Sequence, residues 1–278
     1  FNPFRPFLTS VQNNRDHRKI TSVDGKIAFT GGINLADEYI NERERFGHWK
    51  DAGIQLRGDG AWSFTVMFLQ MWSFLTKKEE NCTAYLPDQT EAVPAGTRGW
   101  VQPFCDSPMD EFSVGEHTYR HLIAAAKNYV YITTPYLMVD NDLISTLKLA
   151  AESGVDVRII TPRKPDKKIV HFTTRSYYRE LLHSGVRIFE YTDGFIHSKN
   201  FAVDDRMGSV GTVNMDFRSL YMHFECGVCL YGTDSLADVK ADFLATQEKC
   251  CEITEKTWKR NPVLAFLQDI CRLFAPMM

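Results

Sequence analysis

The chain has 278 residues, of which 44% are hydrophobic and 24% are charged, a composition typical of soluble globular proteins. Its formal net charge of −3 argues against a protein that coats nucleic acid, although a local basic pocket is compatible with that value. The length predicts about two domains, each large enough to bury a core.

The start of the chain indicates a fragment. It begins with Phe1 instead of Met, and FNPFRPFL lacks the charged-then-apolar order of a secretion signal. We therefore expect an upstream part of the protein that this chain does not include. The longest stretch without a charged residue is 60–76, with 17 residues. A membrane span needs roughly 20 predominantly apolar residues, so this stretch predicts a buried helix.

In chain order, the first region predicts few elements. They are the strand of a motif over 17–24, a return strand over 27–31, a strand near 51–57 and a helix over 60–76. Residues 77–100 are polar and rich in turn formers, and we interpret them as an interdomain linker or an exposed loop. This division predicts a truncated first lobe over 1–76 and a second lobe over 101–278.

From residue 101 onward, strands alternate with helical segments, which predicts βα units on a mixed sheet. The predicted strands are VQPF, VYITTPYL, VDVRIITP, VRIFEY, 207–213 and 224–231. The predicted helices lie near 112–127, 141–153, 169–183, 233–250 and 262–275. The last helix is apolar at helical spacing, which favours a place in the core over contact with lipid.

Seven cysteines occur in the chain, and their odd number and spacing do not fit a disulfide framework. Cys226 and Cys229 form a CxxC pair inside an alternating, strand-like stretch, with no second CxxC to complete a zinc site. We interpret them as buried strand residues. The sequence predicts neither a metal site nor a cofactor.

One short pattern, H-x-K-x4-D followed by G-x-x-N, occurs twice at a spacing of 180 residues. The first copy is His17, Lys19, Asp24, Gly31 and Asn34, and the second is His197, Lys199, Asp204, Gly211 and Asn214. Chance predicts about 0.03 copies of H-x-K-x4-D at these residue frequencies, so two copies with matching tails indicate function.

Strand geometry brings the parts of each copy together. Residues i and i+2 of a strand project from the same face, so each histidine points the same way as its lysine. The aspartates, Asp24 and Asp204, fall at a hairpin corner and are better suited to fixing a turn than to donating a proton. On the return strand, Asn34 and Asn214 can bring amide N–H donors to the same pocket.

This equipment suits chemistry on a phosphate ester. Lysines and asparagines neutralise and position non-bridging oxygens, one imidazole attacks phosphorus, and the other protonates the leaving oxygen. Our hypothesis gives the attack to His17 and the acid/base role to His197, although a pseudo-symmetric pair can exchange roles. No metal ion is needed for such a mechanism.

A nucleophilic histidine needs an acceptor on its second ring nitrogen. Two acids lie at comparable distances after the motifs, Asp51 and Glu225. We predict that Asp51 orients His17 and that Glu225 orients His197. Arg163 and Lys164 follow a predicted strand, where they fit a second phosphate or a solvated basic loop equally well. The other six histidines are interpreted as structural.

The duplicated motif is the signature of the phospholipase D superfamily, and the chain resembles bacterial cardiolipin synthases. The blocks that carry the resemblance are HRKITSVDGKIAFTGGINLADEYIN, GFIHSKNFAVDDRMGSVGTVNMDFRSLYMHFECG, TTPYL, PRKPDK and RLFAPMM. The resemblance extends over nearly the whole chain and implies an α/β fold. In that family two lobes form an α/β/α sandwich with mixed sheets, and the active site lies where the lobes face each other. Relative to the family, the first lobe of this chain is truncated.

The resemblance implies a phosphatidyltransferase that makes cardiolipin from two phosphatidylglycerol molecules and releases glycerol through a phosphohistidine intermediate. It places His17, Lys19, Asp24, His197, Lys199 and Asp204 in the catalytic set, with Lys19, Asn34, Lys199 and Asn214 on the phosphate. The implied partners are a phospholipid and a membrane surface, with no nucleic acid. The implied location is the bacterial cytoplasmic membrane, reached through N-terminal helices that this chain lacks.

Two alternatives remain at this stage. The same site could hydrolyse phospholipid, or less readily a nucleic acid phosphodiester, which the modest net charge disfavours. The second alternative is a scaffold that binds lipid without turnover. The intact histidines, lysines and asparagines in both copies argue against it.

Overall fold

The computed structural model describes residues 14–87, 96–258 and 261–278. Its largest element is a mixed sheet of eight strands in the order β15-β9-β8-β6-β11-β12-β14-β5. The strands are β5 (Trp100–Asp106), β6 (Tyr129–Thr133), β8 (Asp156–Pro162), β9 (Arg187–Tyr191), β11 (Asn200–Val203), β12 (Met207–Gly211), β14 (Glu225–Tyr231) and β15 (Cys250–Ile253). Strand β8 runs parallel to β6 and β9, and the other pairs are antiparallel.

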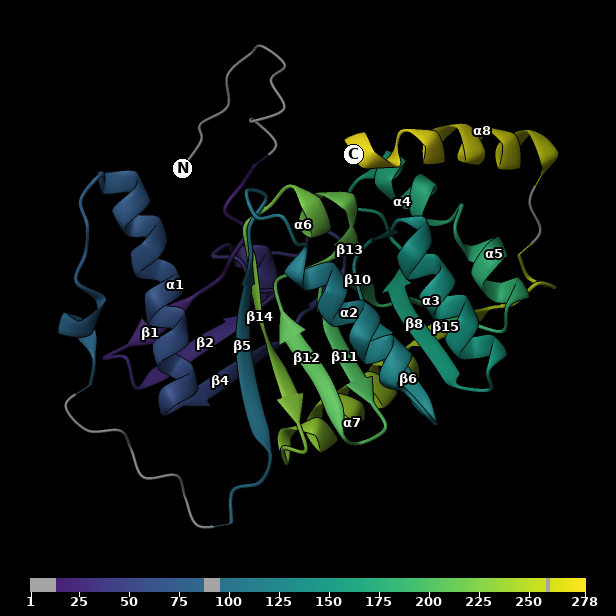
Figure 1. Ribbon diagram of the computed structural model, residues 1–278. Helices are drawn as coiled ribbons and strands as arrows, with labels where there is room; N and C mark the ends of the chain where they lie inside the picture. Colours follow the sequence, from purple (N-terminus) through teal and green to yellow (C-terminus); the bar gives the residue numbers. More distant parts are fainter. Residues whose placement is uncertain (1–13, 88–95, 259–260) are drawn as a thin grey trace.

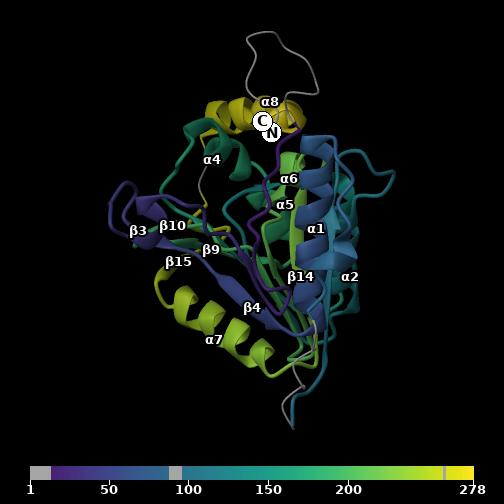
Figure 2. The ribbon, with the colours of Figure 1, turned by 90° about the vertical axis from the view of Figure 1, so that its left-hand side faces the viewer.

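Helices cover both faces of this sheet, as Figures 1 and 2 show. On one face lie α2 (Val114–Ala125), α3 (Asn141–Glu152) and α5 (Tyr178–His183), and on the other lies α7 (Ser235–Gln247). The remaining helices of this part are α4 (Lys168–Thr174), α6 (Phe217–Tyr221) and α8 (Pro262–Leu273), with a short 3-10 turn η4 (Ala275–Met277). The predicted α/β class with a mixed sheet is confirmed.

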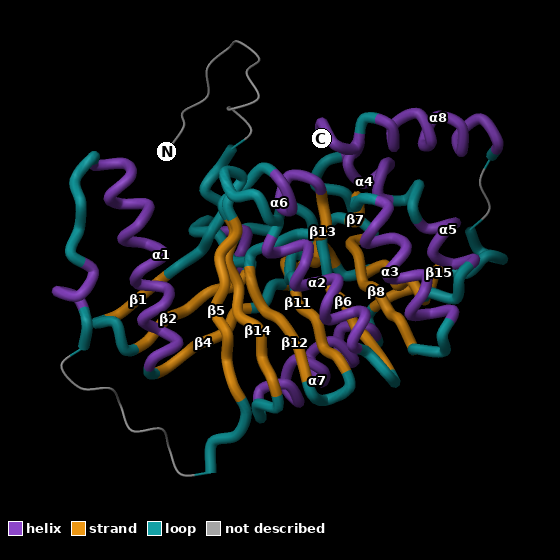
Figure 3. Tube along the Cα trace, in the orientation of Figure 1, coloured by secondary structure: helices purple, strands orange, loops and turns teal. Residues whose placement is uncertain are grey.

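A second, smaller sheet is built from the first motif copy. Its three antiparallel strands are β1 (Thr21–Val23), β2 (Ile27–Gly31) and β4 (Gly53–Arg57). Helix α1 (Asp59–Thr76) packs on it and buries Phe64 completely. One apolar cluster joins this sheet to the large one, with Ala28, Leu56, Phe64 and Met67 against Val210, Cys226, Val228 and Leu230. Figure 3 shows the strands of the two sheets side by side.

Short parallel pairs complete the fold. Strand β3 (His48–Lys50) pairs with β10 (Gly194–Ile196), and β7 (Leu137–Met138) pairs with β13 (Met215–Asp216). Two 3-10 turns, η2 (Asp37–Ile40) and η3 (Cys82–Tyr85), lie in the first part of the chain. Turn η3 falls within the predicted linker 77–100, of which 88–95 lie outside the described residues. The predicted boundaries of the lobes stay a prediction.

The predicted helix over 169–183 is interrupted, and this part of the prediction is wrong. Helix α4 ends at Thr174 and α5 begins at Tyr178. Between them, the Ser176 hydroxyl donates to the Thr173 carbonyl at 2.6 Å, and the Ser176 amide donates to the same oxygen at 2.9 Å. A serine that bonds to the nearby backbone competes with the helical pattern in this way.

The two cysteines of the CxxC pair lie in β14, where both are buried and neither forms a disulfide. Their interpretation as buried strand residues is confirmed. The helix predicted over 60–76 is present as α1, but the prediction that it is buried is wrong. Its residues Phe68, Trp72, Phe74 and Leu75 are exposed, so the helix is half-buried. No helix among the described residues is both long and apolar enough to cross a bilayer.

The two motif aspartates both occupy turns with a positive φ, 53° at Asp24 and 52° at Asp204. Their surroundings differ. Asp204 accepts hydrogen bonds from the backbone amides of Lys127, Asn128 and Tyr129, at 2.6, 2.9 and 2.8 Å, and so ties the β11–β12 turn to the start of β6. Among the described residues, no such bond reaches Asp24, because no strand lies on the outer side of β1.

We predict that Asp204→Ala lowers the free energy of unfolding by about 1–2 kcal/mol more than Asp24→Ala, since only Asp204 accepts three amide bonds and its carboxylate is partly exposed. Both changes place alanine at a positive φ, so that shared cost cancels in the comparison. Urea unfolding at neutral pH measures the difference, and equal losses would contradict the assigned role. The three amide bonds outweigh burial and lower the pKa of Asp204. The difference should therefore vanish as the pH falls through that lowered pKa.

Candidate active site

The two motif histidines are held by backbone pairings that cross between the two motif copies. The amide of His17 donates to the carbonyl of Phe224 at 2.9 Å, and Asp16 forms a parallel bridge with Phe224. In the other direction β3 pairs with β10, and the amide of His197 donates to the carbonyl of Lys50 at 2.7 Å. Neighbours across a parallel pair share a face of the sheet. This register therefore places His17 beside Glu225 and His197 beside Asp51.

The carboxylate of Glu225 holds the first imidazole. Nδ1 of His17 lies 2.9 and 3.0 Å from its two oxygens, and the hydroxyl of Thr212 donates to one of them. The Glu225 side chain is fully buried, whereas that of His17 is 24% exposed. Burial alone would raise the pKa of Glu225, but the adjacent His17 and Lys19 hold that pKa well below its ordinary value. Glu225 is thus a buried anion that accepts the Nδ1 proton of His17.

The carboxylate of Asp51 holds the second imidazole. Nδ1 of His197 lies 2.8 Å from the Asp51 Oδ2, and the Ala52 amide donates to Oδ1 of the same side chain at 2.9 Å. Burial alone would raise the pKa of Asp51, but Lys199 and His197 outweigh it and lower that pKa. An ionised Asp51 accepts the Nδ1 proton of His197, so in both histidines Nε2 is left with its lone pair.

The predicted assignment of acids to histidines is wrong: Glu225 orients His17, and Asp51 orients His197. The prediction paired each histidine with the acid that follows it in the chain. The structure pairs it with the acid of the other motif copy, because the parallel bridges at Phe224 and Lys50 join segments far apart in sequence. Both predicted acids are in the site, and only their partners are exchanged.

The two lysines lie inside the site in low-dielectric surroundings. The ammonium of Lys19 donates to the His17 carbonyl at 2.6 Å, and that of Lys199 lies 2.8 Å from the His197 Nδ1. Burial lowers the pKa of Lys19. Burial and the nearby Lys19 together lower the pKa of Lys199 to about 7. Burial and the charge of Lys199 lower the pKa of His197 to about 3.

The two asparagines differ in the free site. The amide of Asn34 donates to the hydroxyl of Tyr39. Asn214 is buried, and its Oδ1 has no hydrogen-bond partner among the described residues. A buried amide whose oxygen lacks a partner is costly unless a ligand or another group meets it. Either asparagine can still donate to a ligand oxygen through its amide nitrogen, because the bond to Tyr39 uses only one of the two N–H hydrogens of Asn34.

Several site residues were not found from the sequence. Tyr39 packs its ring edge against His197 with centroids 5.3 Å apart, and Trp49 lies 5.2 Å away on the same imidazole. His223 lies two residues before Glu225, with its ring centroid 5.5 Å from that of His17. Its Nδ1 is 3.7 Å from Glu225, too far for a hydrogen bond. In the sequence, the position of His223 two residues before Glu225 could have indicated that both side chains lie on the same side of the strand.

The two motif copies differ at one position that matters for the site. Thr212 follows Gly211 in the second copy, whereas Gly32 follows Gly31 in the first. A Cβ at Gly32 would lie 2.0 Å from Oδ1 of Asp51 and 2.8 Å from the His197 carbonyl. Glycine is therefore needed there to admit Asp51, while Thr212 supplies a hydroxyl to Glu225.

Two groups of residues bring possible metal ligands together among the described residues. They are His17, His223 and Glu225, and Glu116, Asp140 and Asp142, each with ligand atoms within 4.8 Å. In the first, Glu225 already binds Nδ1 of His17. In the second, Arg120 pairs with Glu116 and Asp142. These contacts account for both groups without an ion.

The chain is similar to several known proteins. Residues 119–246 match the family model described as "Cardiolipin synthase, PLD-like domain". The chain is 40% identical over 280 positions to a cardiolipin synthase of Geobacillus sp., of which it covers 55%. It is also 47% identical over 279 positions to an uncharacterized protein of Streptococcus mutans, of which it covers 60%. Both alignments include 100% of this chain.

Residues 119–246 thus match a phospholipase D-like domain of the cardiolipin synthase type, and the whole chain is similar to cardiolipin synthases. It spans little more than half the length of the curated relatives that it matches. The fold is similar to that of a phosphatidylserine synthase of Haemophilus influenzae, with a TM-score of 0.66 and 17% identity over 94% of this chain and 70% of that one. The predicted phospholipase D-like fold is thus confirmed.

In this candidate site, the lowered pKa of Lys199 predicts pH-dependent binding of an oxyanion. Lysine is charged below its pKa, so Lys199 loses its charge as the pH rises through about 7. We expect the affinity for sulfate, whose charge is constant in this range, to fall about tenfold between about pH 6 and pH 9. Isothermal titration calorimetry measures this slope.

The matched variants for this test are Lys199→Met and Lys148→Met. Lys148 forms a half-exposed ion pair with Glu180, away from the site, so its loss should leave the slope unchanged. Lys199→Met should remove most of the slope and bind sulfate weakly at every pH. An undiminished slope in Lys199→Met would show that another group titrates.

Proposed function

We propose that the protein is a phosphatidyltransferase that joins two phosphatidylglycerol molecules into cardiolipin and releases glycerol. One observation carries the proposal: two imidazoles, each bonded through Nδ1 to a buried carboxylate, keep Nε2 free in a site with one buried lysine, Lys199, and one partly buried lysine, Lys19. This is the equipment for a double displacement at a phosphodiester. The similarity to proteins named cardiolipin synthase supports the substrate class.

In the first step Nε2 of His17 attacks phosphorus, and the bond from phosphorus to the glycerol headgroup breaks. The leaving oxygen takes a proton from Nε2 of His197. In the second step a hydroxyl of another phosphatidylglycerol returns that proton to His197 and attacks phosphorus, which releases His17. The lysines and Asn214 stabilise the oxygens of the transition state, and Glu225 balances the charge that develops on His17.

The difference in exposure supports the choice of His17 as the nucleophile. Its side chain is 24% exposed, against 7% for His197, so phosphorus can approach it more easily. Because the pKa of His197 is about 3, its Nε2 carries no proton at neutral pH before the substrate binds. Binding of the anionic phosphodiester between the lysines adds a negative charge, which raises the pKa of His197 and lets it serve as an acid.

The activity is tested by incubating the protein with labelled phosphatidylglycerol in vesicles and resolving the products. Cardiolipin and glycerol in equal amounts are expected. Phosphatidic acid without cardiolipin would indicate that water is the acceptor and that the protein is a hydrolase. No product from the protein with both histidines intact would contradict an enzymatic role.

The roles of the histidines are tested by acid quenching after a short reaction with substrate labelled at phosphorus. We predict that His17→Ala forms no covalent adduct. His197→Ala should still form some, because its loss slows departure of the leaving group without removing the nucleophile. Glycerol release should fall in both variants by about 10²-fold or more. An adduct in His17→Ala that disappears in His197→Ala would show that the roles are reversed.

A further inference from the structure

Helix α8 turns its apolar side away from the protein. The large apolar residues exposed on this helix and its end are 37–78% exposed, and they are Val263, Leu264, Phe266, Leu267, Ile270, Leu273 and Phe274. Most of them recur at spacings of three and four, which places them in one stripe along the helix. Asp269 is also exposed. The prediction that this helix packs in the core is therefore wrong.

The polar side of α8 faces the protein instead. Gln268 is the one buried residue of the helix and donates to the carbonyl of Phe172 at 3.3 Å. Arg272 forms an ion pair with Glu180 at 2.9 Å, and its guanidinium lies over the Tyr177 ring. A helix whose stability came from the core would have the opposite orientation.

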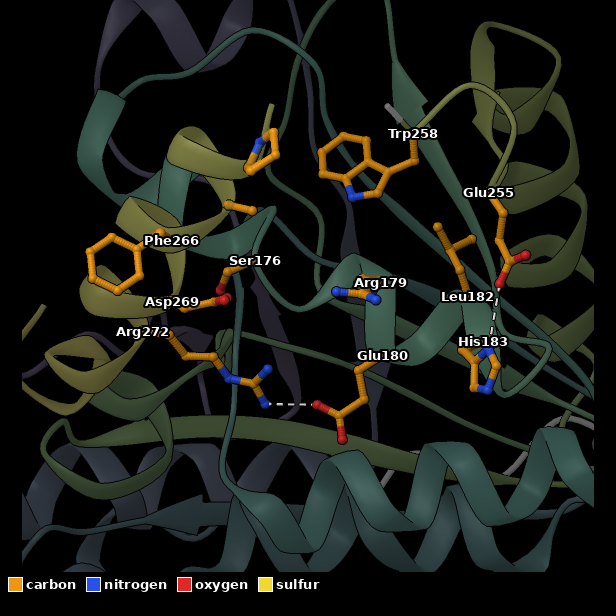
Figure 4. A pocket seen from close by; sticks show the side chains of 12 residues that line it. Ser176, Arg179, Glu180, Leu182, His183, Glu255, Trp258, Phe266, Asp269 and Arg272 are labelled. Atoms are coloured by element: carbon orange, nitrogen blue, oxygen red, sulfur yellow. Dashed lines mark hydrogen bonds and ion pairs between the residues drawn. The ribbon is translucent and has the colours of Figure 1, made fainter. Parts of the chain in front are cut away.

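A cavity of about 940 Å³ separates much of α8 from the body of the protein. Figure 4 shows this pocket between α5, the loop at Glu255 and Trp258, and α8, with the Arg272–Glu180 pair across its floor. The helix is thus held by a few polar contacts and by its C-terminal end, where Ala275 is fully buried. Of the apolar stripe, Phe266 lines this cavity, and it is still 65% exposed.

Cations lie at the start of α4, the helix that packs against α8. Helix α4 packs against α8, and at its start Lys167 and Lys168 are exposed, followed by Ile169, which is 56% exposed. Lys164, in the loop before α4, is also exposed. None of these three lysines forms an ion pair with another residue in the described parts of the chain. Exposed apolar side chains next to unpaired lysines match the two components of an anionic bilayer.

Contacts through α6 connect α8 to the segment that carries His223 and Glu225. Turn η4, which follows α8, packs on α6, and Arg218 of α6 bonds to the Met277 carbonyl at 3.5 Å. Helix α6 leads directly to His223 and Glu225. Figures 1 and 2 both show α4, α6 and α8 on the same side of the molecule.

We propose that α8 lies in the interface of an anionic lipid bilayer, with its apolar stripe among the acyl chains and Lys164, Lys167 and Lys168 on lipid phosphates. A second copy of the chain fits less well, because a two-fold contact through this stripe would bring the lysines of both copies close together. The proposal deepens the proposed function, on which it rests for the lipid substrate.

The test is co-sedimentation of the protein with vesicles of phosphatidylcholine alone or with a third of phosphatidylglycerol. The variant Phe266→Gln, Ile270→Gln, Leu273→Gln keeps good helix formers and should lower partitioning onto both vesicles by ~10-fold or more. Lys167→Gln with Lys168→Gln should lower it about tenfold on phosphatidylglycerol vesicles only, and high salt should remove that difference.

The matched control is Leu149→Gln with Leu244→Gln, which changes exposed leucines of α3 and α7. It should bind vesicles as the unchanged protein does, and circular dichroism confirms that each variant is folded. Equal binding by the α8 variant and the control would overturn the proposal. So would a folded α8 variant that changes only the oligomeric state, measured by light scattering.

Activity separates this proposal from the proposed function. On a short-chain phosphatidylglycerol dissolved as monomers, the α8 variant should match the unchanged protein, while on vesicles its turnover should fall ~10-fold or more. If no protein turns over the monomeric lipid but the α8 variant still loses vesicle binding, the proposed function fails and the bilayer site stands. Equal vesicle turnover by variant and control would refute the bilayer site alone.

Discussion

The structure of the site depends on two short parallel pairings that cross between the motif copies. One joins Asp16 to Phe224, and the other joins β3 to β10. Each sets a register in which a histidine meets a carboxylate from a distant part of the chain. Without either pairing, one imidazole would lose the acceptor on Nδ1 and with it the fixed tautomer that leaves Nε2 free.

Burial gives these pairings their electrostatic effect. Glu225 and Lys199 are completely or almost completely removed from solvent, and neither charge would be tolerated there alone. The acids stay ionised because lysines and imidazoles lie beside them. Burial in the same site lowers the pKa of Lys199. The site is therefore preorganised for an anionic ligand.

Much of this arrangement could be predicted from the sequence, because it is local. A period of two on a strand determines that His17 and Lys19 share a face, and the duplicated spacing identifies both halves of the site. The α/β class and most helices of the second part follow from hydrophobic periodicity for the same reason. The acids Asp51 and Glu225 were also identified.

What could not be predicted depends on contacts between distant segments. Which acid meets which histidine is decided by register between strands that are far apart, and no local pattern carries it. The outward stripe of α8 has the same periodicity as a core helix, since only the tertiary environment of Gln268 and Arg272 determines which side faces inward. The break between α4 and α5 came from one hydroxyl, that of Ser176.

The crossed pairings also determine when the site can exist. His197 meets an acid 146 residues earlier, and His17 meets one 208 residues later. Contacts this far apart form late, since the chain must close long loops before they stabilise it. During synthesis His17 stays without its carboxylate until Glu225 has emerged from the ribosome. A partly made chain therefore holds the whole first motif but no orienting partner for its histidine.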